Sequence, residues 1–158
     1  MRKRIIIPSV QKEAPAPVED WLDLDRLAEV EITSEDREHP IESALIPGRS
    51  PGWRAAGPGE QTIRLLFAHP QQLRRIRLEF FESVNERTQE FVLRVSEDGG
   101  YSYRDIIRQQ WNFSPRGATR ETEDHRVDLS GVTMLELSII PDISGGDAHA
   151  SLAQLRLA

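Results

Sequence analysis

The feature that most constrains this chain is an apolar–polar alternation that follows a glycine-rich turn. Residues 52–61 hold three glycines and Trp53, and residues 62–67 then alternate in polarity, with Arg64 on the polar side. The apolar positions are Ile63, Leu65 and Phe67. A period of two is typical of a β-strand with one buried face, whereas a helix repeats every 3.6 residues. The stretch predicts a half-buried strand, with Trp53 at the edge of the core.

The same alternation recurs along the chain and predicts an all-β protein. The other expected strands are 27–33, 73–81, 91–95, 101–111, 127–129, 132–140 and 151–157. The expected connections are a helical turn at 41–45, turns at 69–72, 96–100 and 130–131, and polar loops at 112–124 and 141–147. Since two sheets can bury each other's apolar faces, about eight such strands favour an antiparallel β-sandwich.

Residues 1–24 differ from the rest and are interpreted as an N-terminal arm or linker before a domain at 25–158. Three prolines interrupt any regular element in the arm. Ile5–Ile7 are candidates for an added edge strand, and Trp21, Leu22 and Leu24 for anchoring the arm, the alternative being a partly disordered terminus. The apolar run 5–7 is too short for a secretory signal, which needs about seven apolar residues or more. A cytoplasmic location is therefore expected.

Composition excludes several classes of site. The chain has no cysteine, so it forms no disulfide and has no thiolate nucleophile or metal ligand. Its formal net charge of -6 disfavours nucleic acid and anionic membranes as partners. No apolar run approaches the ~18 residues of a membrane span.

The sequence also carries no recognisable catalytic or metal motif. The four histidines lack the spacing of a metal site, and no nucleophile elbow or phosphate-binding loop occurs. The acidic run Glu121–Asp124 is interpreted as a solvated charged surface rather than a cation site. We expect a non-catalytic protein without a metal or cofactor.

Several segments together resemble the discoidin, or coagulation-factor C-type, domains. The hairpin Val95–Tyr103 is similar to their S-x-D-G-x-x-aromatic hairpin, residues 150–157 to their last strand, and residues 30–45 to their first strand and turn. The resemblance implies a galactose-binding-like jelly-roll sandwich over residues 25–158 that binds ligands through loops at one end. The turn 45–51 lacks the acid that supports calcium in many sugar-binding members, and the disulfide of secreted members is also missing.

A second, shorter resemblance covers residues 53–63, which are similar to a segment in the N-terminal domain of the eukaryotic scaffold of single-strand-break repair. That resemblance implies contacts with a repair polymerase and nicked DNA. Arg64, Arg74, Arg75, Arg77 and Arg94 are candidates for a basic sheet face. Outward arginines on strands more often pair with acids, such as Glu79 and Glu90 here.

The expected loops at the ends of the strands supply the candidate ligand-binding residues. They are His39, Arg49, Arg54, Trp111, Asn112, Arg116 and His149. Sugars bind where an aromatic face meets paired donors and acceptors, and these residue types supply both. Trp53 is assigned to the core, while Trp111 is open between core and ligand platform.

Two functions follow from these observations. The first is a non-catalytic module that recognises carbohydrate, or a similar small polar ligand, through its end loops. The alternative is an intracellular protein-interaction or repair-scaffold-like domain.

Overall fold

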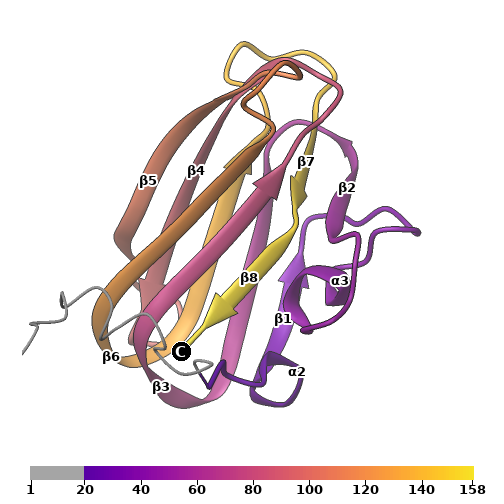
Figure 1. Cartoon of the computed structure of the whole chain (residues 1–158). Coiled ribbons are helices and arrows are strands. Elements are labelled where there is room, and N and C mark those ends of the chain that lie inside the picture. Colours follow the sequence, from indigo (N-terminus) through magenta and orange to yellow (C-terminus); the bar gives the residue numbers. More distant parts are fainter. Residues whose placement is uncertain (1–19) are drawn as a thin grey trace, which may run out of the picture.

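Eight antiparallel strands and two one-turn helices make up residues 20–158, the part of the chain that the computed structural model describes. In chain order they are α2 (Leu24–Leu27), β1 (Ala28–Ile32), α3 (Glu42–Leu45), β2 (Trp53–Pro58), β3 (Gln61–Phe81), β4 (Arg87–Ser96), β5 (Arg104–Phe113), β6 (Arg120–Ile140), β7 (His149–Leu152) and β8 (Gln154–Leu157). The strands run in the order β1-β3-β6-β4-β5, β8 also pairs with β3, and β2 pairs with β7 (Figure 1).

Two long strands, β3 and β6, connect the layers of the sandwich. Residues 61–66 of β3 pair with 134–139 of β6, and residues 73–81 pair with 120–129. Register shifts separate these two ladders, because both strands bend there (Figure 1). One layer therefore holds β1, β4, β5 and the first ladder. The other holds β8, the second ladder and β7, which leads directly into β8.

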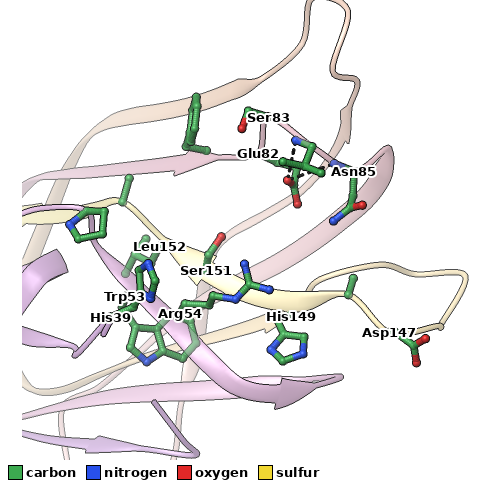
Figure 2. A pocket seen from close by; sticks show the side chains of 15 residues that line it. His39, Trp53, Arg54, Glu82, Ser83, Asn85, Asp147, His149, Ser151 and Leu152 are labelled. Carbon is green, nitrogen blue, oxygen red and sulfur yellow. Dashed lines mark hydrogen bonds between the residues drawn. The ribbon is translucent and has the colours of Figure 1, made fainter. Parts of the chain in front are cut away.

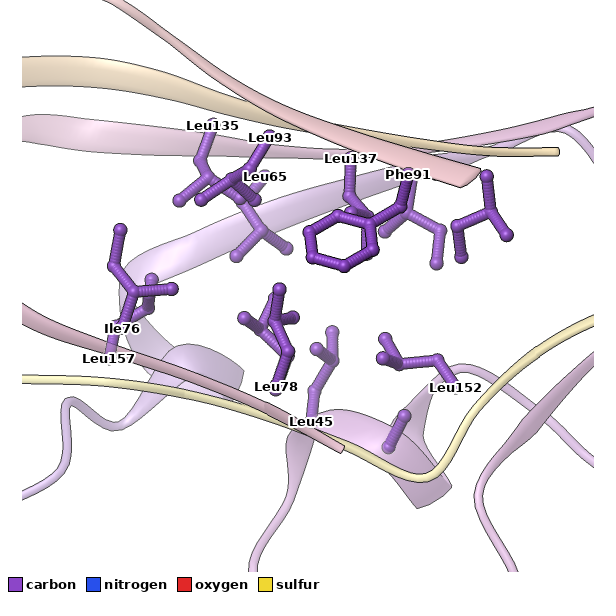
Figure 3. Packing of buried hydrophobic residues seen from close by; sticks show 14 of the residues in the cluster. Leu45, Leu65, Ile76, Leu78, Phe91, Leu93, Leu135, Leu137, Leu152 and Leu157 are labelled. Atoms are coloured by element: carbon purple, nitrogen blue, oxygen red, sulfur yellow. The ribbon is translucent and has the colours of Figure 1, made fainter. Parts of the chain in front are cut away.

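The core lies between the layers, as the alternation requires. Figure 3 shows Leu65, Phe91 and Leu135 of one layer facing Leu78 and Leu152 of the other. The Phe80 and Phe91 rings meet across the core with their centroids 5.1 Å apart. The predicted β-sandwich is confirmed.

The hairpin between β4 and β5 forms where Ser96–Gly100 predicts a turn. Ser96 Oγ accepts the backbone N–H of Gly100 at 2.9 Å, and Asp98 Oδ1 accepts that of Ser102 at 2.9 Å. The Ser102 hydroxyl, followed by the Ser102 backbone N–H and the Ser96 hydroxyl, lowers the pKa of Asp98 to about 2. Gly99 and Gly100 both adopt positive φ.

Three predicted connections are wrong. The turn expected at 130–131 lies within β6, which is one strand from Arg120 to Ile140. Residues 69–72 are not a turn between strands but a bend within β3, and most of the predicted loop 112–124 belongs to β5 and β6. Only residues 114–119 connect those two strands. The prediction failed because Glu121, Glu123 and His125 occupy core-facing positions of β6, so the expected apolar alternation is missing there.

The remaining segments agree with prediction in part. The first strand and the helical turn at 41–45 form as predicted. The single last strand expected at 151–157 is replaced by two strands, β7 and β8. The glycine-rich stretch after Gly52, which was expected to be a turn, mostly forms strand β2.

The segment that leads into α2 packs on the domain. Leu22 donates its backbone N–H to Leu157 O at 2.7 Å, and the Arg75 guanidinium lies 5.0 Å from the Trp21 ring centroid. Leu24 is buried in the core. The predictions for residues 1–19, including the added strand at Ile5–Ile7, lie outside the described residues.

Candidate functional site

A pocket of about 240 Å³ opens at the end of the sandwich where the chain leaves β3 and enters β7. The connection after β3 lines it with residues 81–85, and β7 with its preceding residues lines it with 147–149 and 151–153. Trp53, Arg54 and His39 line the remaining side (Figure 2). Four segments far apart in the sequence thus meet around one opening.

Trp53 belongs to the buried base of this pocket, not to its accessible surface. Its side chain is 1% exposed, and its Nε1–H donates to Ser34 O at 3.0 Å. A buried indole N–H needs such a partner, and here the partner fixes the ring plane. The assignment of Trp53 to the core is confirmed.

His39 is held at the rim by a carboxylate. Its Nδ1 lies 2.8 Å from Asp36 Oδ2, and the same contact is the largest cause of the lowered pKa of Asp36. Since an ionised carboxylate only accepts hydrogen bonds, Nδ1 is the donor and carries the hydrogen. Within residues 20–158, the Nε2 atom of His39 has no hydrogen-bond partner.

His149 is oriented in the same way by a carbonyl group. Its Nδ1 lies 3.0 Å from Ala55 O, so Nδ1 is again the donor. A neutral imidazole in this tautomer offers Nε2 as an acceptor, and a protonated one offers it as a donor. Two histidines from opposite sides of the pocket therefore each keep one ring nitrogen for hydrogen bonding.

The connection after β3 is shaped by Glu82. Its Oε2 accepts the backbone N–H groups of Val84 and Asn85 at 3.1 and 3.3 Å, and its Oε1 accepts Arg87 Nε at 2.8 Å. Burial raises the pKa of Glu82, but the bonds from Arg87 and the two amides outweigh burial and lower it. The Glu82 carboxylate is thus engaged within the protein, and Asn85 lies at the opening (Figure 2).

An apolar surface adjoins these polar groups. Phe81 is 46% exposed and Val84 is 75% exposed, although large apolar side chains of this protein are otherwise mostly buried. Phe81 faces outward because its neighbour Phe80 fills the core on the other side of β3. The pocket therefore combines an exposed aromatic ring with histidine, arginine and amide groups, which suits a ligand that has both apolar and hydroxyl surfaces.

Three of the seven predicted ligand-binding residues meet at this pocket: His39, Arg54 and His149. The other four lie elsewhere. Arg49 is exposed in the turn after α3, and Arg116 is exposed in the turn between β5 and β6. Asn112 accepts the Thr88 hydroxyl at 2.7 Å in a neighbouring hollow, and Trp111 packs against the core.

Residues 81–85 line the pocket, but none of them was among the predicted ligand-binding residues. Phe81 was expected only as the last residue of the strand 73–81. The doublet Phe80-Phe81 held a usable signal, because adjacent strand residues point to opposite faces and one of the two rings had to face outward.

The predicted basic face does not form. Arg64 and Arg94 lie on one layer and both contact Glu136, at 2.8 and 3.5 Å. Arg75 and Arg77 lie on the other layer and both contact Asp124, at 2.7 and 3.4 Å. The interpretation that outward arginines pair with acids is confirmed, for example by Arg77 and Glu79 at 3.3 Å.

The acidic run Glu121–Asp124 is not a uniformly solvated surface, which corrects the prediction. Glu121 is 1% exposed and accepts Gln89 Nε2 at 3.2 Å between the layers. Its neighbour Asp124 faces outward to Arg75. Within residues 20–158, no cluster of three or more histidines and acids is arranged to hold a metal ion. In the same range, no helix has the length and apolar character needed to cross a membrane.

Comparison with known proteins gives matches among solved structures. No protein-family model matches the chain, and no curated protein matches it. The family 32 carbohydrate-binding module of Clostridium perfringens NanJ, in complex with galactose, is similar with a TM-score of 0.62 and 14% identity. That similarity covers 87% of this chain and 96% of the module.

Two further structures agree. The family 32 module of AlyQ, in complex with 4,5-unsaturated mannuronic acid, has a TM-score of 0.61 and 15% identity, over 87% of this chain and 97% of that one. The F5/8 type C domain of a Bacteroides fragilis protein has a TM-score of 0.60 and 14% identity, over 87% and 93%. At these identities the likeness shows the fold, and the chain has the discoidin-like β-sandwich fold of the F5/8 type C domains and family 32 carbohydrate-binding modules.

Proposed function

We propose that this protein is a non-catalytic carbohydrate-binding module whose site is the pocket after β3. One observation carries the proposal: an exposed aromatic residue, Phe81, lines the same pocket as His39, Arg54 and His149 at the loop end of the sandwich. Two solved domains with this fold are in complex with galactose and with an unsaturated mannuronic acid. Their low identity to this chain means that they support a sugar ligand without naming which sugar.

The chemistry of the pocket fits a pyranose. The C–H face of a sugar ring packs on an aromatic side chain, while its hydroxyl groups need both donors and acceptors. Arg54 supplies donors, Asn85 supplies both, and the Nε2 atoms of His39 and His149 accept or donate according to protonation. We expect weak binding to one sugar unit and tighter binding to longer chains, because a longer chain can make more contacts.

The test is an NMR titration of the labelled full chain with galactose, N-acetylgalactosamine, glucose and mannuronate oligosaccharides. We expect amide shifts confined to residues 81–85, Arg54 and His149. Phe81→Ala is expected to abolish these shifts while the fold is retained. The matched control is Tyr101→Ala, which removes an aromatic ring that is 94% exposed in the hairpin at the opposite end of β4.

The proposal fails if no saccharide of the panel shifts the pocket amides at millimolar concentration. It also fails if Phe81→Ala and Tyr101→Ala bind a sugar equally well. Shifts elsewhere on the domain would place any sugar site outside this pocket and would overturn the assignment of Phe81.

The repair-scaffold alternative stays a prediction and uses the same sample. Its matching segment forms β2 and the start of β3, where Trp53 is buried in the core. Titration with nicked duplex DNA at low salt tests it, because phosphate contacts strengthen as salt falls. Shifts at Arg75 and Arg77 with DNA, and none with sugars, would favour that alternative.

A further inference from the structure

We propose that Arg87 is a positioning residue for the pocket. From inside the protein, its side chain holds two of the loops at this end of the sandwich. This inference rests on the proposed function for its consequence in binding, but its structural part stands on the contacts of Arg87 itself. The side chain is 2% exposed and does not line the pocket.

The first contact of Arg87 fixes the connection after β3. Arg87 Nε donates to Glu82 Oε1 at 2.8 Å, and the other oxygen of that carboxylate accepts the amides of Val84 and Asn85. The orientation of Glu82 therefore determines where these two backbone groups lie. Since Arg87 is the cation bound to Glu82, it sets that orientation.

The second contact of Arg87 fixes the loop between β6 and β7. Arg87 Nη1 donates to Pro141 O at 2.8 Å, at the point where β6 ends and the loop begins. The same loop reaches β7 through Asp147 and His149, which line the pocket. One guanidinium thus contacts the first residues of two loops, the connection that follows β3 and the loop that follows β6.

The surroundings of Arg87 hold the guanidinium in one geometry. Its Nη1 also lies 3.3 Å from Gln89 Oε1, and its Cζ lies 4.7 Å from the centroid of the Phe113 ring. A planar guanidinium makes these bonds in fixed directions while stacking on a ring, whereas an ammonium group is a single point of charge. The arrangement therefore requires arginine rather than any cation.

Because Arg87 is paired with Glu82, removing the Arg87 side chain is expected to change the loops. A buried charge whose partner is removed has no water to replace that partner, so the remaining group moves toward solvent. Without Arg87, Glu82 turns outward and releases the amides of Val84 and Asn85. The connection 82–86 then loses the hydrogen bonds that define its shape next to Phe81.

The test compares Arg87→Met, Arg87→Lys and Glu82→Gln in the full chain, with Arg64→Met as the matched control. Arg64 is also an ion-paired strand arginine, but it contacts Glu136 on an outer sheet face away from the pocket. The readouts are amide hydrogen exchange and ¹⁵N relaxation without ligand. Galactose titration follows for each variant that retains the fold.

In Arg87→Met, we expect exchange at Val84 and Asn85 to accelerate by about tenfold or more relative to the core amides of Leu65 and Leu137. A merely structural role would accelerate loop and core amides together, because it would lower only the global stability. We expect partial recovery in Arg87→Lys and no loop-specific change in Arg64→Met. Glu82→Gln should loosen Val84 and Asn85 as well, and it provides the test if Arg87→Met does not fold.

Unchanged loop exchange in Arg87→Met, or in Glu82→Gln if Arg87→Met is unfolded, would overturn the inference. The two proposals are separable by their outcomes. If the wild type binds no sugar, the proposed function fails while the exchange data still decide the role of Arg87. If the wild type binds galactose and Arg87→Met keeps both its loops and its affinity, only the role of Arg87 is refuted.

Discussion

Glu121 provides the sharpest prediction, because a carboxyl group is buried between the two layers. It is 1% exposed, and its Oε1 accepts a hydrogen bond from Gln89. Among residues 20–158, no group donates to its Oε2. Burial and then the nearby Glu123 carboxylate raise the pKa of Glu121 to about 7, while Gln89 and Arg87 act in the opposite direction. The perturbation is Glu121→Gln, which keeps the shape of the protonated acid and cannot ionise.

The magnitude follows from the two proton affinities. An exposed glutamate in the unfolded chain titrates near 4.5, and Glu121 in the folded protein near 7. Since each tenfold difference in proton affinity is worth about 1.4 kcal/mol, the raised pKa corresponds to about 3 kcal/mol. The folded state binds the extra proton between these two values, so the stability from Glu121 is complete below pH 4.5 and is lost as the pH rises to 7.

The assay is equilibrium urea unfolding of the wild type and Glu121→Gln at pH 5, 6, 7 and 8. Because the variant has no carboxyl at this position, its free energy of unfolding should rise relative to the wild type by up to about 3 kcal/mol between pH 5 and pH 8. Acids whose pKa is lowered, such as Glu82 and Asp124, change the free energy of unfolding only at pH values below this range. Subtracting the free energies of unfolding of the two proteins at each pH cancels the contributions of the titratable groups that both proteins have.

Glu97→Gln is the matched control, since Glu97 is exposed in the β4–β5 hairpin opposite Arg104. Its pH profile should run parallel to that of the wild type. If the difference between the wild type and Glu121→Gln is the same at pH 5 and pH 8, Glu121 does not hold a proton in the folded state. Burial would then not raise the pKa of Glu121.

Three further predictions concern the fold. Gly52→Ala should destabilise by more than about 2 kcal/mol in urea unfolding, because Gly52 has a φ of +107° and an added Cβ would lie 2.6 Å from Leu152 O. Gly57→Ala, where a Cβ meets no atom within 4 Å, should leave the midpoint nearly unchanged, and equal losses would refute the argument. Phe91→Ala should lower the free energy of unfolding by about 3–5 kcal/mol, and a loss below about 1 kcal/mol would show that the core refills. Asp98→Asn should flatten the stability profile between pH 4 and pH 2. The lowered pKa makes ionised Asp98 stabilising above pH 3.8, and this contribution is lost as the pH falls to about 2; parallel acid profiles would count against this.

The sequence predicted those strands whose buried faces are apolar. Ile63 and Leu65, and likewise Ile76 and Leu78, alternate with polar residues, and all four are fully buried. Residues 120–126 of β6 were not predicted as strand, because Glu121 and His125 occupy positions where apolar residues were expected. An apolar–polar alternation can be seen in a sequence only when the buried face of the strand is apolar. A strand whose buried face is polar therefore cannot be recognised by this pattern.

The candidate site was predictable only in part, for a related reason. Residues with hydrogen-bonding side chains in turns, such as His39 and His149, can be recognised from the sequence as candidates. Their meeting with Phe81 depends on which loop ends lie together, and that depends on strand order. Trp111 could not be assigned from the sequence, since its packing against the core depends on the pairing of β5 with β4.

The sequence by itself determined that the chain forms an antiparallel β-sandwich with the Ser96–Gly100 hairpin. Alternation and turn chemistry act between neighbouring residues, so they can be read locally. The tertiary structure alone decided that β3 and β6 bend to serve both layers, that Glu121 is buried and that Arg87 contacts both Glu82 and Pro141. Those features depend on contacts between residues that lie far apart along the chain, where burial and hydrogen-bond partners exist only after the layers have packed.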